Sequence, residues 1–140
     1  MKKTATSSYV VIPGSNEQQK KNPEILRVVL NRDFTRIDFG YAAPFIYEKG
    51  GWIRIAPYSF IVVQGSKQRY RLKDTWNIPV APEVFKFESI KDWKIFSLYF
   101  EPIPVRSCKI DIIEEEEPNK NDFNYYNVVL DDVNGYEIMD

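Results

Sequence analysis

Four cationic side chains at every second position form the pattern in this chain with the clearest chemical meaning: Lys67, Arg69, Arg71 and Lys73. In a β-strand, side chains two residues apart project from one face, about 7 Å from each other. Such a row, joined by Arg54 from a nearby strand, would bind phosphate, an acidic glycan or a nucleic acid backbone, and binding would weaken steeply with salt. The alternative is a solvated outer face whose cations discourage edge-to-edge aggregation. No recognisable nucleic-acid motif accompanies the row.

Tryptophans near predicted strand ends are the second candidate. Trp76 and Trp93 lie in a proline-interrupted region with Lys and Asp neighbours, and they are the two tryptophans expected to be exposed. Exposed indole rings can stack on the apolar faces of sugars, so these residues predict a carbohydrate-binding surface. The alternative is that the rings, Trp52 included, cap the core at its rims.

Acidic residues supply two further candidates. Glu114 to Glu117, with Asp111 and Asp122, offer oxygen ligands for Ca²⁺, but they lack the alternation and the turn glycine of a calcium loop. Glu101 and Asp111 offer the two carboxylates that glycoside hydrolysis needs, although nothing in the sequence places them in one cleft. We therefore expect a solvated acidic loop, and neither a metal nor another cofactor.

The residue types that the chain lacks narrow its chemistry further. It has no histidine, which excludes imidazole-based catalytic triads and most zinc sites. The single cysteine, Cys108, cannot form an internal disulfide, and it shares a predicted strand face with Ile110 and Ile112. We interpret it as a buried hydrophobe, because no base is apparent that would generate a thiolate. These observations favour a protein that is not an enzyme.

Alternation with a period of two predicts the elements that position these residues. Phe96, Leu98 and Phe100 fall on one strand face, and Pro102 and Pro104 then interrupt the ladder because proline has no amide hydrogen to donate. In the segment 34–41 the alternation separates Thr35, Ile37, Phe39 and Tyr41 from Arg36, Asp38 and Gly40. Strands are expected at 25–31, 34–41, 52–55, 58–64, 67–73, 96–100, 107–113 and 123–130, with brief pairing at 9–12 and 84–87 and a hairpin turn between Gln64 and Lys67.

Eight or nine short strands separated by turn signals, without a helical period, indicate an all-β fold. The spacing favours a two-sheet antiparallel β-sandwich, Ig-like or jelly-roll-like, and a small barrel is the second choice. The predicted organisation is a flexible polar leader at 1–22, one β-sandwich domain at 23–130 and an acidic tail at 131–140.

Charge is distributed unevenly along the chain. Residues 111–140 hold ten Asp and Glu against one Lys, and residues 1–110 hold eighteen Lys and Arg against ten Asp and Glu, which gives −9 and +8 for a total of −1. Either each part solubilises its own surface, or the tail screens a basic face until an anionic partner arrives. No apolar run has transmembrane length or forms an export signal, which predicts a cytoplasmic protein, or an envelope protein if a signal has been trimmed.

Several short motifs resemble an uncharacterised β-sandwich domain family of Bacteroidetes proteins. In order, they are Ile55 to Phe60, Arg69 to Leu72, Ile78 to Pro82, Phe96 to Pro104, Ile110 to Glu114 and Phe123 to Tyr126. The resemblance covers roughly residues 25–130, and the stretch Phe96 to Pro104 is its distinctive part. It implies a sandwich fold and a bacterial envelope setting, and it implies no catalytic residues. The chain departs from the family at Asn127, where a glycine is expected.

The leading functional hypothesis is a non-catalytic interaction or structural module whose partner is another protein or a glycan. The alternative is a carbohydrate- or polyanion-binding domain that uses Trp76, Trp93 and the Lys67–Lys73 strand face with Arg54. A third hypothesis is an enzyme that works with carboxylates alone, which would require two of them to face each other in a deep cleft.

Overall fold

All regular structure in the described part of the chain is β-strand. The computed structural model describes residues 7–13, 23–42, 52–86, 93–114, 124–131 and 138–139. Their strands are β1 (Ser7–Val11), β2 (Glu24–Leu30), β3 (Thr35–Ala42), β4 (Trp52–Ile53), β5 (Phe60–Val63), β6 (Arg69–Trp76), β7 (Phe85–Lys86), β8 (Trp93–Phe100), β9 (Cys108–Ile113), β10 (Tyr125–Leu130) and β11 (Ile138–Met139). The prediction of an all-β fold is confirmed.

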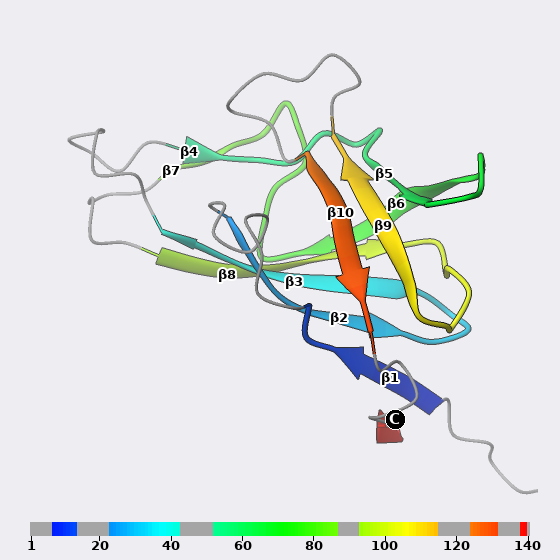
Figure 1. Ribbon diagram of the computed structural model, residues 1–140. Coiled ribbons are helices and arrows are strands. Elements are labelled where there is room, and N and C mark those ends of the chain that lie inside the picture. The colour runs from blue at the N-terminus through cyan, green and yellow to red at the C-terminus, as the bar shows by residue number, and fades with distance from the viewer. Residues whose placement is uncertain are drawn as a thin grey trace, which may run out of the picture.

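Nine of these strands form one antiparallel sheet, in the order β10-β9-β5-β6-β8-β3-β2-β1-β11, and β4 pairs separately with β7. Figure 1 shows that the sheet is strongly curved, with β9 and β10 crossing in front of β2 and β3. The result is a nearly closed, barrel-like sheet. The two sheets expected from the sequence are not clearly separated, because the ladder is continuous from β10 to β11. Alternation along single strands is the same in a sandwich and in a barrel, so the sequence pattern could not distinguish them.

Strand β6 forms the bend in this sheet. Its first part, Arg69–Arg71, pairs with β5, and its second part, from Leu72 to Trp76, pairs with β8. A register shift between the two places Lys73 in a bulge. Bulges bend a strand and increase its twist, which lets one strand serve both halves of the sheet.

The hairpin between β5 and β6 has the turn that the sequence predicts. Gly65 adopts a φ of 91°, a backbone conformation that favours glycine, and the Ser66 amide donates a 3.0 Å hydrogen bond to the Val63 carbonyl. Strand β6 begins at Arg69, two residues later than predicted, so Lys67 lies in the connection and not in the strand.

Large apolar side chains from both halves of the curved sheet fill its interior. Phe39 on β3 stacks on Phe96 on β8 with ring centroids 5.1 Å apart, and Tyr125 on β10 meets Phe39 at 5.6 Å. Phe96, Leu98 and Phe100 are completely buried, as their alternation predicts. Burial of each such side chain stabilises the fold by roughly 2–3 kcal/mol, so these strand faces determine which side of the sheet becomes the core.

The proline-containing connection from 101 to 107 carries the chain from one half of the sheet to the other. Strand β8 pairs with β3 and β6, whereas β9 pairs with β5 and β10. The Thr35 hydroxyl holds the connection by donating to the Glu101 carbonyl (3.2 Å) and accepting from the Ile103 amide (3.0 Å). Ile103 is itself buried, so the connection is anchored by both a polar and an apolar contact.

Segments near both chain ends contribute strands. Tyr9 to Val11 pair with β2, which confirms the brief pairing expected there, and Ser7 and Ser8 pair with β11. Strand β11 lies within the predicted tail. The remainder of the predicted leader and tail, at 1–6, 14–22, 132–137 and 140, lies outside the described residues.

Candidate functional site

The register of four strands brings four outward side chains into one row. Arg27 on β2 lies opposite Asp38 on β3, Asp38 lies opposite Ser97 on β8, and Ser97 lies opposite Trp76 on β6. Residues opposite each other on neighbouring strands project from the same side of a sheet. We use the name outer face for this surface, which consists of the side chains Arg27, Arg36, Asp38, Trp76, Trp93, Ile95 and Ser97.

Asp38 is buried although it projects from the outer side of β3, with 2% of the residue exposed. Its carboxylate accepts hydrogen bonds from Ser97 Oγ (2.6 Å), Arg27 Nε (2.5 Å), Arg36 Nε (3.0 Å) and Arg36 Nη2 (3.3 Å). The Arg27 side chain remains 53% exposed and that of Arg36 29%. The two guanidinium groups therefore cover the carboxylate and stay accessible from solvent.

The charge of Asp38 is stabilised by these partners. Burial acts to raise the pKa of the Asp38 carboxyl, since it disfavours the charged form. The hydrogen bond from Ser97 and the guanidinium groups of Arg27 and Arg36 outweigh burial, and the pKa of Asp38 lies below its ordinary value. The site is therefore a fixed anion flanked by two cations, with one positive charge in excess.

Two tryptophans and an isoleucine form the apolar part of the outer face. Trp76, Trp93 and Ile95 expose 56%, 69% and 38% of their surface, which confirms the exposure expected of both tryptophans. Trp93, Ile95 and Ser97 alternate along β8, whose register with β3 is unbroken, so they share one side. Trp76 and Trp93 are thereby about 14 Å apart along the sheet, with Ile95 between them. The side chain of Trp52 lies outside the described ones.

Gly40 and Leu26 shape the sheet beside these rings. Gly40 lies opposite Ile95, in the position on β3 next to Asp38 on the same side. A Cβ atom at Gly40 would lie 3.5 Å from the Leu26 side chain, so Leu26 already occupies the space above the glycine. Glu24 on β2 lies opposite Gly40 and is exposed, so the surface between Arg27 and Trp93 holds one carboxylate beside small and apolar groups.

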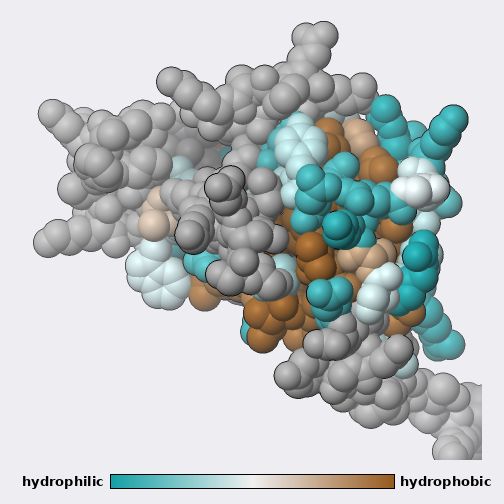
Figure 2. All heavy atoms as spheres, viewed as in Figure 1, coloured by the Kyte–Doolittle hydropathy of each residue, from teal (hydrophilic) through white to brown (hydrophobic). Residues whose placement is uncertain are grey.

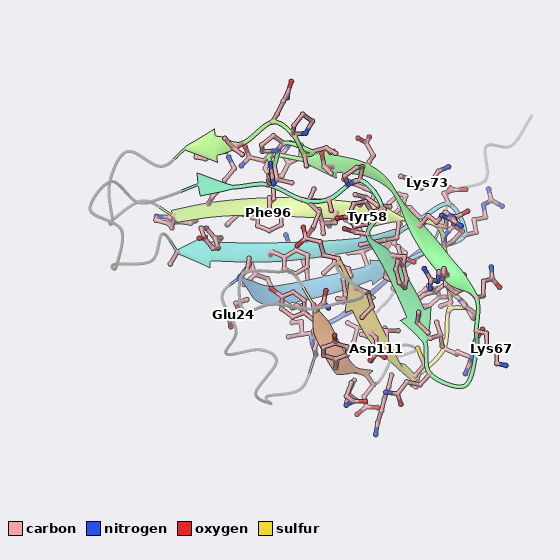
Figure 3. All side chains as sticks on the ribbon, turned by 90° about the horizontal axis from the view of Figure 1, so that it is seen from above. Glu24, Tyr58, Lys67, Lys73, Phe96 and Asp111 are labelled. Atoms are coloured by element: carbon pink, nitrogen blue, oxygen red, sulfur yellow. The ribbon has the colours of Figure 1, made fainter. Side chains whose placement is uncertain are left out.

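Three cations of the predicted basic row lie on the outward side of β6, before Trp76, and the fourth, Lys67, lies in the connection before the strand. Lys67, Arg69, Arg71 and Lys73 are all exposed, and Tyr70 between them is buried. Figure 3 shows Lys67 and Lys73 at the margin of the molecule, whereas Phe96 lies in its interior. Figure 2 shows hydrophilic residues gathered at the right of the molecule, where Figure 1 places the β5–β6 hairpin.

Two residues of this row also make structural contacts, Arg69 through its side chain and Arg71 through its backbone. The Arg69 guanidinium carbon lies 4.3 Å from the ring centroid of Phe60, a cation–π geometry. The Arg71 amide donates to the Glu101 carboxylate (2.8 Å), and its carbonyl accepts from the Glu101 amide (2.9 Å). Arg54 lies outside the nine-stranded sheet, between β4 and Ile55, and Ile55 bridges to Val80 in the segment after β6.

The described carboxylates of the two acidic candidates bind backbone amides. Glu114 accepts from the Ala56 amide (2.9 Å), and Asp111 accepts from the Asn127 amide (2.9 Å). Asn127 has a φ of 55°, a conformation that glycine or asparagine adopts readily, so asparagine suits this position. Glu115 to Glu117 and Asp122 lie outside the described residues. Within the described residues no group of His, Cys, Asp and Glu is arranged to hold a metal ion.

Two further titratable groups have shifted pKa values for a common reason. Burial raises the pKa of the Cys108 thiol, and Arg106 opposes this only in part. Burial also lowers the pKa of Lys94, whose ammonium lies 3.7 Å from the ring centroid of Phe85 and donates to Asn77 Oδ1 at 3.0 Å. Both shifts disfavour the charged form, as expected for groups at the margin of a core.

The sequence pattern gives little sign of the Asp38 network. Alternation along 34–41 puts Arg36 and Asp38 on one strand side, and this spacing is the only part of the network visible in the sequence. Arg27 and Ser97 join through the register of three strands, and that register depends on a bulge between Ile25 and Arg27. Pairing partners and bulges are tertiary features, so single-strand periodicity cannot reveal them.

No helix among the described residues has the length and apolar character needed to cross a membrane. No protein-family model, curated protein or solved structure matches the chain. The resemblance to the Bacteroidetes β-sandwich family is not tested by these comparisons and stays a prediction.

Proposed function

We propose that this chain is a non-catalytic binding module whose outer face takes up a carbohydrate. The observation that carries the proposal is the exposure of Trp76 and Trp93, 56% and 69%, on the same side of neighbouring strands. Burying a large aromatic ring is favourable, so a protein that leaves two of them in water on one surface gains by covering them with a ligand.

A carbohydrate suits this surface because sugars have both apolar faces and polar edges. The indole rings would stack on the C–H faces of sugar rings, and the polar row from Arg27 to Ser97 supplies donors for hydroxyl groups beside them. The rings stand on paired strands, so the spacing between them is fixed before the ligand arrives. Such preorganisation reduces the entropy lost on binding.

The test is a titration of the protein with a panel of neutral oligosaccharides, followed by tryptophan fluorescence and calorimetry. Trp93→Ala and Trp76→Ala should each weaken binding at least tenfold, since each removes one stacking platform. Tyr58→Ala is the matched control, because Tyr58 is equally exposed (59%) but lies in the turn before β5. Unchanged affinity in both tryptophan variants would refute the proposal.

A second candidate is binding of a polyanion along β6. Its support is the exposure of Arg69, Arg71 and Lys73 along β6 and of Lys67 in the connection before it. The association constant for heparin or a polyphosphate should then fall steeply with salt, so that its logarithm decreases linearly with the logarithm of the salt concentration. Double substitution of Arg69 and Arg71 by glutamine should remove the response, and loss of Trp93 should leave it intact.

We also propose the finer description of the fold as a two-layer sandwich. The change of partners along β6, from β5 to β8, supports it, because strands that switch sheets at a bulge form the corners of orthogonally packed sandwiches. Residue-resolved hydrogen exchange tests this description. Fast exchange of the backbone amides around Lys73 would support two separate sheets, and protection equal to that of the flanking residues would favour the barrel.

A further inference from the structure

Stacking of sugars on Trp76 and Trp93 leaves one feature of the outer face unused. Asp38 is a buried carboxylate with four hydrogen bonds on the side of the sheet that faces solvent. A buried ion pair is seldom more stable than apolar residues of similar size, because the charges lose their hydration. Stability alone therefore gives little reason for a charged residue at this position.

The effect of Asp38 on Arg27 suggests a different reason. Arg27 has a side chain that is about half exposed, and an arginine with that exposure ordinarily samples many rotamers. Here the carboxylate holds Arg27 through Nε at 2.5 Å. No hydrogen bond from the two Nη groups of Arg27 is made to the part of the chain that the structure describes. The outer edge of the guanidinium is thus fixed in place with donors available.

Arg36 binds the same carboxylate through two nitrogens, Nε and Nη2, and is less exposed. The network thus holds two cations around one carboxylate, and Arg27 is the more exposed of the two cations. An excess positive charge with planar, oriented donors is the usual protein counterpart of a carboxylate, which it binds through two parallel hydrogen bonds.

Resting on the carbohydrate function proposed above, we propose that Arg27 binds the carboxylate of an acidic sugar, a hexuronic acid residue of an oligosaccharide. The neighbouring sugar rings lie over Ile95 and the two tryptophans. The row Arg27–Asp38–Ser97–Trp76 spans three strand spacings, about 14 Å, so two to three linked sugars reach from Arg27 to Trp76, and a longer chain is needed to cover Ile95 and Trp93 as well. Asp38 and Ser97 are positioning residues, because they act on the ligand through Arg27.

The outer face is a better carboxylate site than the basic row of β6. The β6 cations stand on long side chains at the margin of the molecule, and Arg69 is directed onto Phe60. They would attract any polyanion, with little discrimination between a carboxylate and a phosphate. Among the described cations, Arg27 and Arg36 are both held by Asp38 on the surface that carries the indole rings, and Arg27 is the more exposed of the two. A fixed cation beside indole rings selects an anionic group attached to a sugar.

The test compares binding of an oligogalacturonate with its methyl ester, which has the same rings and linkage but no charge. Wild-type protein should bind the acid at least tenfold more tightly than the ester, in calorimetry at 0.15 M salt. Equal affinity would overturn the inference without any variant. Citrate and inorganic phosphate serve as free anions, and binding of these as tight as that of the acid would also overturn it.

Variants then assign the effect to Arg27. Arg27→Lys keeps the charge but not the planar pair of donors, and Arg27→Gln removes the charge. In both variants the affinity for the acid should fall to the affinity for the ester. Arg69→Gln is the matched control and should leave both ligands unchanged. Circular dichroism confirms that each variant is folded, and the comparison of acid and ester is made within each variant.

The outcomes separate this inference from the carbohydrate function. If Trp93→Ala weakens both acid and ester while Arg27→Gln weakens neither, the carbohydrate function stands and the carboxylate site is wrong. If Arg69→Gln abolishes acid binding and the tryptophan variants do not, both are wrong and the β6 row is the binding site. If the protein binds neither oligosaccharide, the carboxylate site is overturned, and the neutral panel decides the function.

Discussion

The phenol of Tyr125 donates a 2.5 Å hydrogen bond to the carbonyl oxygen of Pro23, and this contact joins β10 to the start of β2 across the core. The two residues lie far apart in the sheet order, since five strands lie between β10 and β2. The bond is buried, and Tyr125 also contacts Phe39 in the interior. It therefore fixes the two halves of the curved sheet against each other.

Tyr125→Phe should lower the free energy of unfolding by about 1–2 kcal/mol, because the buried Pro23 carbonyl loses its partner while the ring remains. Urea denaturation followed by circular dichroism measures this. Tyr58→Phe, at an exposed residue, is the control and should change the midpoint little. A Tyr125→Phe variant as stable as wild type would show that the phenol does not hold the sheet closed.

Because of the Asp38 network, the free energy of unfolding should depend on pH in the acidic range. Because the pKa of Asp38 is lower in the folded state, the unfolded state binds more protons between the two pKa values, and stability rises with pH there. The contribution is complete above about pH 4 and is lost as pH falls through the folded pKa. Asp38→Asn should remove this part of the pH dependence and cost about 1.5–3 kcal/mol at pH 7, the range for hydrogen bonds to a charged group.

Urea unfolding of wild type and Asp38→Asn between pH 2 and 7 provides the measurement. Asp111→Asn is the control, because Asp111 binds the Asn127 amide at an exposed position. The difference between wild type and Asp38→Asn should shrink as pH falls. A difference that stayed constant with pH would mean that the charge of Asp38 is not what stabilises the network.

Cys108 should alkylate slowly. Burial raises the pKa of its thiol, so less thiolate is present at pH 8 than in a free cysteine, and the group is only partly accessible. Iodoacetamide should react with the native protein at least tenfold more slowly than with glutathione, and urea should remove the difference. The chain has one cysteine, so mass spectrometry follows the reaction without ambiguity. Native reactivity equal to that of glutathione would contradict the burial of Cys108.

Truncation of an aromatic residue should lower stability strongly in the core and little on the outer face. Phe96→Ala removes a completely buried ring and should destabilise the protein by about 3–5 kcal/mol. Trp93→Ala, on the same strand but facing solvent, should change stability by less than about 0.5 kcal/mol. Thermal unfolding of the two variants measures both. A large loss in Trp93→Ala would make Trp93 a structural residue and remove the support for a binding role.

Features carried by one strand at a time could be predicted from the sequence. The alternation of Phe96, Leu98 and Phe100 predicts their shared burial, and Gly65 predicts the turn between β5 and β6. The exposure of Trp76 and Trp93 was predicted from their polar, proline-interrupted surroundings. Local periodicity and turn chemistry are sufficient for such features.

Features that depend on which strands pair could not be predicted. Strand β6 changes partners at Lys73, and no residue there marks the change, so the sheet was expected to be two sheets. Asp38 is buried because Arg27 and Ser97 meet it from two other strands. Alternation assigns an aspartate to the solvated side of a strand, and it contains no information on what covers that side.

The most direct test of the binding proposal is the two-dimensional ¹H–¹⁵N spectrum of the protein during titration with an oligosaccharide that binds. The account predicts shifts of the indole N–H signals of Trp76 and Trp93 and of the Gly40 and Ile95 amides, with little change at Gly65 in the β5–β6 turn. Shifts confined to Arg69, Arg71 and their neighbours, or no shift at either indole, would contradict the outer face as the binding site.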